Sequence, residues 1–209
     1  MKILEVKNLE IPEVVIVNYK RFSDHRGYFT EHFRKSDLID KSGIESLKGK
    51  AFLQANESFS YKGTFRGLHF QWNPHMGKLV RLVTGNLIDF ALDIRKNSPS
   101  LGKIIGYNLR AEIEKDYGEW IWVPPGFAHG ILLVEDSLVE YFCTGEYNPE
   151  CEAGISPFAE DIDWSVCDSQ LKKKFYEIVS ETEFISDKDR AGFTLNGWLK
   201  DPRSDNFIF

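Results

Sequence analysis

The sequence contains no apolar run long enough to cross a membrane, and it has few cysteines. A membrane-spanning helix needs about 18 to 20 consecutive apolar residues, and no segment approaches that length. Residues 1–5 lack the apolar core of a secretory signal peptide, so we expect no leader. Cys143, Cys151 and Cys167 form no Cys-x-x-Cys pair. We therefore expect a cytoplasmic location, no membrane contact, no disulfide framework and no zinc site.

Positive charge is also in short supply. The formal net charge is −6, from 26 Lys and Arg against 32 Asp and Glu. Nucleic-acid binding favours a basic surface, so we expect no nucleic-acid partner, although a local group of Arg and Lys could still hold a small anion. Hydrophobic residues make up 42% and charged residues 28% of the 209 residues, which is ordinary for a globular protein with a sizeable core.

Long helical patterns are absent from the first 150 residues, which contain short β-rich runs instead. The expected strands cover residues 14–17, 52–58, 64–71, 78–84, 87–94, 104–109, 120–123, 130–134 and 138–144. Strands at such intervals predict an all-β sandwich or barrel. We expect one domain over residues 1–209, with a β core at about 10–150. The remaining segment, 151–209, should wrap this core and contain a helix near 170–179.

Residues 64–71 (TFRGLHFQ) carry the most distinctive polar pattern. Successive side chains of a strand point to opposite faces, so we expect His69 and Gln71 on one face and Arg66 on the other. Lys78 opens the next expected strand and could lie beside His69. An imidazole near an ammonium in a barrel interior is a candidate base with an electrostatic stabiliser. The alternative is a hydrogen-bonded core histidine and a surface lysine.

Other polar side chains on neighbouring strands could face the same interior. His129 opens an expected strand that could lie near His69, and Tyr141 lies on the strand after it. A buried tyrosine is more often a hydrogen-bonded core residue than a catalyst. Gln54 and Asn56 share one face of their strand. That face is either solvated or the wall of a polar pocket.

The spacing of the histidines does not favour a metal site. Metal-binding β-barrels of this kind use His-x-His followed by a carboxylate, but His69 is followed by Phe70 and Gln71. The sequence also contains neither a Gly-x-Gly-x-x-Gly fingerprint nor a phosphate-binding P-loop. We predict no metal and no dinucleotide cofactor. A metal-dependent oxygenase remains an alternative that elemental analysis would test.

Seven segments, in order, resemble the dTDP-4-dehydrorhamnose 3,5-epimerase family. They are DHRGYFTE (24–31), FLQAN (52–56), RGLHFQ (66–71), GKLVR (77–81), DIRKNSP (93–99), PGFAHG (125–130) and residues 141–152. The resemblance implies a double-stranded β-helix, the cupin jelly roll, assembled as a homodimer. It implies a nucleotide-diphospho-4-keto-6-deoxy sugar as substrate, with dTDP-4-dehydro-6-deoxyglucose as the first candidate. Epimerisation at C3 and C5 would proceed through an enolate and need no cofactor.

The same resemblance implies chemical roles for four residues. His69 corresponds to the base that removes the proton next to the ketone, and Tyr141 to the acid that returns a proton on the opposite face. Lys78 corresponds to the group beside the developing enolate oxygen, where a positive charge in a dry site is stabilising. Asp189, at the end of a Ser-x-x-Asp segment, corresponds to the partner that fixes the tautomer of His69 and makes it more basic.

The resemblance also implies a set of substrate-binding residues. Those expected near the pyrophosphate or the sugar are Arg26, Gln54, Asn56, Arg66 and His129. Those expected near the nucleobase are Tyr28, Phe29, Glu31 and Tyr147, of which Tyr147 could stack on the base.

The sequence departs from the family pattern after the tyrosine strand. Residues 155–164 (ISPFAEDIDW) stand in place of the usual Trp-x-Asp-Pro, and the segment between Trp164 and Ser186 is longer than expected. These departures leave three alternatives open. They are an epimerase of one carbon only (C3 or C5), a GDP- or CDP-linked substrate, and a nucleotide-sugar binding protein without turnover.

Overall fold

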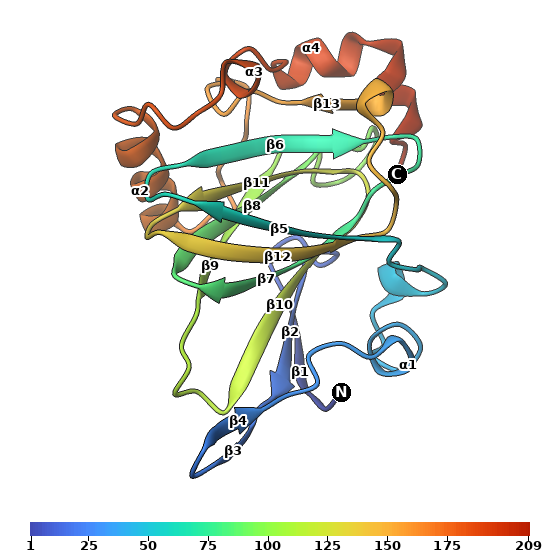
Figure 1. The fold of residues 1–209 in the computed structure, drawn as a ribbon. Helices are drawn as coiled ribbons and strands as arrows, with labels where there is room; N and C mark the ends of the chain where they lie inside the picture. Colours follow the sequence, from blue (N-terminus) through green and yellow to red (C-terminus); the bar gives the residue numbers. More distant parts are fainter.

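Two antiparallel sheets form the body of the molecule in a computed structural model that describes all residues from 1 to 209 (Figure 1). The six-stranded sheet has the order β1 (Ile3–Asn8), β2 (Val15–Lys20), β10 (Tyr117–Val123), β7 (Lys78–Thr84), β12 (Ser137–Cys143) and β5 (Gln54–Ser60). The five-stranded sheet has the order β13 (Glu152–Gly154), β6 (Phe65–Gln71), β11 (Phe127–Leu133), β8 (Asn86–Asp93) and β9 (Ile104–Arg110). This is the expected double-stranded β-helix, the cupin jelly roll.

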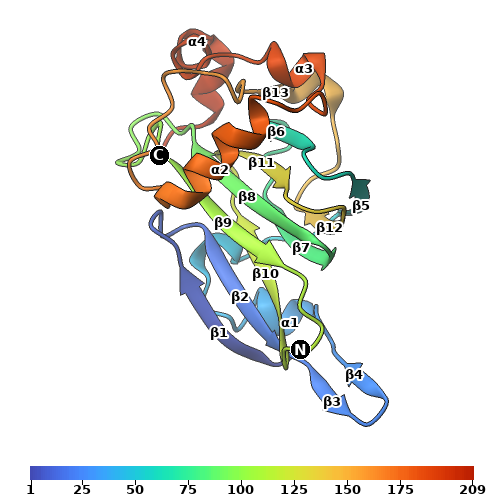
Figure 2. The same ribbon diagram turned by 90° about the vertical axis from the view of Figure 1, so that its left-hand side faces the viewer.

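The other elements are short. Strands β3 (Phe22–Asp24) and β4 (Gly27–Phe29) form a hairpin that projects from one end of the body (Figures 1 and 2). The helices are α1 (Lys35–Leu38), α2 (Ser169–Val179), α3 (Asp187–Arg190) and α4 (Leu195–Lys200), with 3₁₀ helices at Glu45–Leu47, Pro149–Cys151 and Pro202–Asn206. None of the helices combines the length and the apolar character that crossing a membrane requires.

Strand β8 lies at the centre of the five-stranded sheet, and all eight of its residues are buried. One face of β8, with Leu87 and Ala91, packs inside the barrel against the six-stranded sheet. The other face, with Phe90, packs against the C-terminal segment. A strand covered on both faces is apolar on both sides, and residues 87–94 follow this pattern except at Asp89 and Asp93, which are buried as well.

The C-terminal segment covers the outer face of the five-stranded sheet. The expected helix is α2, which Asp168 caps by accepting hydrogen bonds from the backbone N–H groups of Gln170 and Leu171. Phe175 of α2 packs edge to face on Phe90, with ring centroids 5.3 Å apart. Apolar side chains of this segment, which include Trp164, Phe175 and Trp198, join the same buried cluster as β6 and β8. Burial of this apolar stripe, rather than helix propensity, is what stabilises α2.

The prediction that Arg66 and His69 lie on opposite faces of β6 is wrong, because the alternation of side chains is interrupted at one point. His69 pairs with His129 of β11, but Arg66 pairs with Ile131, so β6 contains one residue more than β11 between these two pairs. The extra residue turns Arg66 to the same side as His69, and both line the interior cavity. Gly67 lies inside this bulge with φ of 142°, and a Cβ atom there would lie 2.4 Å from the Cα of Gly130. Only glycine fits that position.

Candidate active site

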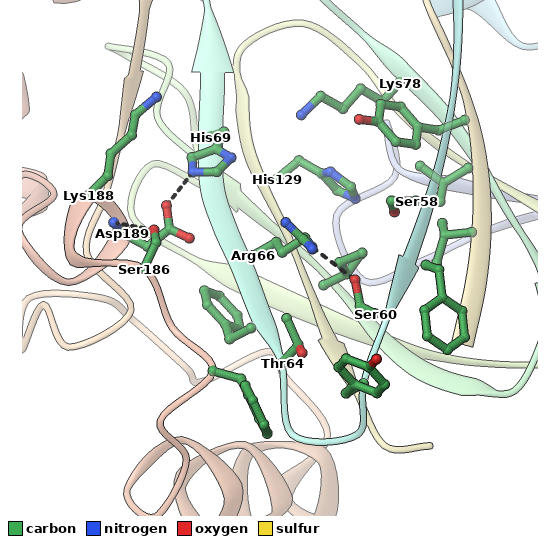
Figure 3. Close-up of a pocket in the computed structure, with 18 residues that line it drawn as sticks. Ser58, Ser60, Thr64, Arg66, His69, Lys78, His129, Ser186, Lys188 and Asp189 are labelled. Atoms are coloured by element: carbon green, nitrogen blue, oxygen red, sulfur yellow. Dashed lines mark hydrogen bonds and ion pairs between the residues drawn. The ribbon is translucent and has the colours of Figure 1, made fainter. Parts of the chain in front are cut away.

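A cavity of about 560 Å³ lies inside the barrel and is lined by residues of β5, β6, β7, β11 and β12 (Figure 3). A second cavity of about 370 Å³ adjoins it, and His69, Lys78 and Tyr141 line both. The combined space is of the size that proteins use for small-molecule ligands. These three side chains therefore lie at the centre of one two-lobed site.

His69 is held by a carboxylate from the C-terminal segment. Its Nε2 lies 2.6 Å from Oδ1 of Asp189, which α3 places beside β6 (Figure 3). Ser186 caps α3 and accepts a hydrogen bond of 3.1 Å from the backbone N–H of Asp189. Burial opposes ionisation of Asp189, but its hydrogen bonds with His69 and Ser186 hold the pKa of this carboxyl below its ordinary value. The carboxylate fixes the ring and leaves Nδ1 free to act on a ligand.

Lys78 and Tyr141 come from the opposite sheet. They lie on the adjacent strands β7 and β12, where Lys78 pairs with Cys143 and Tyr141 pairs with Val80. The interpretation of Lys78 as a surface lysine is wrong, because it lines both lobes of the cavity. Burial lowers the pKa of the Lys78 ammonium and raises the pKa of the Tyr141 phenol. Tyr141 therefore keeps its proton at neutral pH.

His129 also faces the cavity, and the structure gives it a partner that the sequence analysis did not identify. His129 is the cross-strand neighbour of His69, and its Nε2 lies 2.8 Å from Oδ2 of Asp89 on β8. Both residues are buried, and Oδ1 of Asp89 has no hydrogen-bond partner. A carboxylate with two apolar residues before it and three after it, in the stretch 87–92 (LIDFAL), was the signal that could have identified Asp89, because an unpaired buried charge is costly.

The remaining predicted residues near the cavity divide between its two lobes. Arg66 lies in the larger lobe, where its Nε donates a hydrogen bond of 2.9 Å to Oγ of Ser60 (Figure 3). Gln54, Asn56 and Tyr147 line the smaller lobe. Gln54 donates to Asn56 and accepts a hydrogen bond of 2.8 Å from the backbone N–H of Tyr147. The row of amides is thus the wall of a polar pocket rather than a solvated face.

Four predicted residues do not reach the cavity within one chain. Arg26, Tyr28 and Phe29 lie on the hairpin of β3 and β4, and Glu31 follows it. The hairpin projects away from β5 and β6 (Figure 1). Arg26 is paired with Asp24, and Glu31 with Arg34, while 71% of Phe29 is exposed. These residues line neither lobe of the cavity of their own chain, so their role in substrate binding stays a prediction.

The ionisable side chains offer no obvious metal site. No group of three or more His, Cys, Asp or Glu residues is gathered as metal ligands would be. The two histidines of the cavity, His69 and His129, are each hydrogen-bonded to a carboxylate.

Known proteins resemble this chain in sequence. The sequence model of the dTDP-4-dehydrorhamnose 3,5-epimerase family matches residues 8–197. The dTDP-4-dehydrorhamnose 3,5-epimerase of Escherichia coli K12 is 40% identical over 203 residues, which are 94% of this chain and 97% of that protein.

Solved structures are similar over almost the whole chain. The Legionella pneumophila dTDP-6-deoxy-D-glucose-3,5-epimerase, in complex with dTDP-4-keto-L-rhamnose, has a TM-score of 0.79 at 33% identity and covers 98% of this chain and 97% of that one. ChmJ, a 3'-monoepimerase from Streptomyces bikiniensis, shares the fold at a TM-score of 0.69 and 24% identity, over 91% of this chain and 87% of its own. By sequence and by structure, this chain belongs to the dTDP-4-dehydrorhamnose 3,5-epimerase family.

Proposed function

We propose that this protein epimerises a dTDP-4-keto-6-deoxy sugar at C3 and C5 without a cofactor. The observation that carries the proposal is the placement of His69 and Tyr141 on opposite walls of one cavity. His69 lies on β6 of the five-stranded sheet and Tyr141 on β12 of the six-stranded sheet. Inversion at a carbon requires that a proton leaves one face of the sugar ring and another arrives on the opposite face.

The chemistry follows from these positions. His69 takes the proton from the carbon next to the ketone, and the electrons of the C–H bond move into an enolate whose charge rests on the ketone oxygen. Asp189 stabilises the imidazolium that forms. Lys78 neutralises the enolate oxygen. Tyr141 gives its proton to the other face of the carbon. The imidazolium of His69 then releases its proton to solvent, and the tyrosinate regains one from solvent.

Substrate binding is proposed for the residues that surround this centre. The Arg66 guanidinium suits the diphosphate, because its fork of N–H groups matches phosphate oxygens. His129, Gln54 and Asn56 offer hydrogen bonds to sugar or phosphate, and the half-exposed ring of Tyr147 offers a face for the nucleobase.

The direct test is turnover of dTDP-4-keto-6-deoxyglucose, followed by proton NMR. Inversion at both C3 and C5 is expected. Inversion at one carbon would favour a single-carbon epimerase instead, an activity that the fold accommodates in ChmJ. Tight binding without conversion would favour a nucleotide-sugar binding protein, and conversion of GDP- or CDP-linked sugars alone would exclude the dTDP substrate.

The pH dependence of the rate should report on Lys78. The mechanism requires the charged ammonium for enolate stabilisation, and burial lowers the pKa of Lys78. We therefore expect kcat to fall as the pH rises, at a lower pH than the one at which an exposed lysine loses its proton. Lys78→Arg should retain partial activity and move this alkaline loss to higher pH, because guanidinium stays charged. Profiles of kcat for both proteins provide the check. An unchanged alkaline limb in Lys78→Arg would assign the titration to another group.

We further propose a homodimer in which the hairpin of one subunit completes the cavity of its partner. The hairpin carries the exposed rings of Tyr28 and Phe29 and the exposed Arg26, whose ion pair with Asp24 lies within the hairpin. None of the three lines the cavity of its own chain. Exposed aromatic residues grouped on a projecting element are typical of interaction sites. This arrangement would bring the predicted nucleobase-binding residues to the substrate after all.

Co-expression of two inactive variants tests this arrangement. One subunit carries His69→Asn, and the other carries Arg26→Ala with Phe29→Ala. A mixed dimer would contain one cavity with His69 and an intact hairpin from its partner, so random pairing should restore about one quarter of the sites. Absence of any recovery in purified mixed dimers would show that each hairpin serves its own chain or no site at all.

We also propose that residues 1–209 act as one domain. Residues after 150 supply Asp189 and the buried Trp198, and they pack into the same apolar cluster as β6 and β8. A fragment that ends at residue 150 should therefore fail to unfold cooperatively in urea.

A cytoplasmic location is proposed because all three cysteines are free, and cell fractionation would test it.

A further inference from the structure

The wall behind His69 is formed by two short elements, β13 and α3. β13 pairs with β6 so that Gly154 lies opposite His69 and Glu152 lies opposite Gln71. A Cβ atom on Gly154 would lie 3.2 Å from Cδ2 of His69, so the backbone of β13 packs directly against the imidazole. The position of this wall therefore sets the position of the ring.

Consecutive residues of α3 contact both β6 and β13. Asp189 contacts His69 on β6, and Lys188 forms an ion pair with Glu152 on β13. Helix α3 has only four residues, and a single helical turn is unstable in isolation. Its placement must come from tertiary contacts. One of these lies at its C-terminal end, where Oγ of Ser156 donates a hydrogen bond of 3.0 Å to the carbonyl of Arg190.

Glu152 is suited to hold the other side of α3. Only 15% of its side chain is exposed, whereas 62% of the Lys188 side chain is exposed. Burial opposes ionisation of Glu152, but hydrogen bonds from Lys188 and Tyr147 hold its pKa below the ordinary value. The hydroxyl of Tyr147 donates to the same oxygen, Oε1, at 2.8 Å. Glu152 is thus a fixed anion on β13, and its ion pair with Lys188 holds α3 next to that strand.

We propose that the Glu152–Lys188 ion pair positions Asp189 against His69, so that both members act as positioning residues for the base. The pair holds α3 to β13 one residue before Asp189, and β13 in turn supports the ring that Asp189 contacts. This inference rests on the proposed role of His69 as the base.

A competing account is that Lys188 serves only as a phosphate ligand, since it lines the larger lobe. The titration of His69 separates the two accounts by sign. Removal of a nearby cation would raise the midpoint of that titration, whereas loss of the Asp189 contact would lower it. The titratable and charged groups that line the two lobes around His69 are Asp189, Glu152, Lys188, Glu57, Arg66, Lys78, His129, Tyr61, Tyr141, Tyr147 and Cys143.

The experiment follows the His69 imidazole by NMR in the intact protein, together with kcat and KM on the keto sugar. The variants are Lys188→Met, Glu152→Gln and the double variant. Asp187→Asn, which removes an exposed charge from the same helix, is the control. Lys188→Met should lower the midpoint of the His69 titration and reduce kcat about twofold to fivefold, the range for a partly exposed ion pair.

The double variant provides a second criterion. If the pair acts as a unit, the double variant should be no slower than the slower single variant, because either change already breaks the contact. The proposal is overturned if Lys188→Met raises the midpoint or leaves it unchanged, or raises KM alone. Since the titration needs no turnover, failure of the proposed epimerase activity would leave this test intact.

Discussion

His69→Asn should slow epimerisation by about two to four orders of magnitude, which is typical of the loss of one general base. Asparagine is polar and occupies less space than the imidazole, so the barrel should fold and the Asp189 carboxylate should keep a hydrogen-bonding neighbour. It has no basic nitrogen, so proton removal from the sugar should fail at both carbons. Calorimetric binding of dTDP should change little, because the proposed mechanism places the ring at the sugar rather than at the nucleotide.

His75→Asn is the matched control. His75 lies outside both lobes of the cavity, and its Nε2 lies 2.9 Å from the carbonyl oxygen of Asn206. The same substitution there should leave the rate unchanged. If His69→Asn retained a tenth or more of the wild-type rate under these conditions, another residue would be the base.

Tyr141→Phe should separate proton exchange from inversion. His69 can still remove and return a proton on its own face of the ring, so exchange with solvent should persist with retention of configuration. The opposite face loses its donor, so formation of the inverted product should fall about a hundredfold or more. Phenylalanine fills the same space within the barrel, where the ring of Tyr141 packs beside the interior cluster.

Deuterium incorporation and product formation, measured in one reaction, provide the check on Tyr141→Phe. Tyr176→Phe, which removes a hydroxyl from the surface of α2, is the control for loss of a phenol elsewhere. If exchange and inversion fell by the same factor in Tyr141→Phe, the phenol would take part in proton removal as well, and the assignment of the two faces to different residues would be wrong.

The sequence predicted the strands well because their burial follows simple patterns. Alternation identifies the strand that carries Gln54 and Asn56, and a mainly apolar run, interrupted by Asp89, identifies β8. The predicted face of Arg66 is wrong, because one extra residue in β6 reverses the alternation. Gly67 is the only local sign of this bulge in the sequence.

Contacts between distant residues were predictable only through the family resemblance. His69 and Asp189 are 120 residues apart, and no periodicity links them. The resemblance selected Asp189 correctly as the neighbour of His69. It did not indicate Asp89 behind His129, and it placed the hairpin residues Tyr28 and Phe29 near a substrate that their own chain cannot bring to them. In the proposed homodimer that last placement depends on a second copy, which a single sequence does not describe.

The central claim is that opposite walls of one cavity exchange protons with both carbons next to the ketone. The most direct measurement is deuterium incorporation by the wild-type protein, with dTDP-4-keto-6-deoxyglucose in deuterated water and no added metal or nucleotide cofactor. We predict deuterium at C3 and C5 of the inverted product, and none at either carbon when His69→Asn replaces the wild type. An inverted product that retains its original hydrogen at either carbon, or no incorporation with any nucleotide-linked keto sugar, would contradict the account.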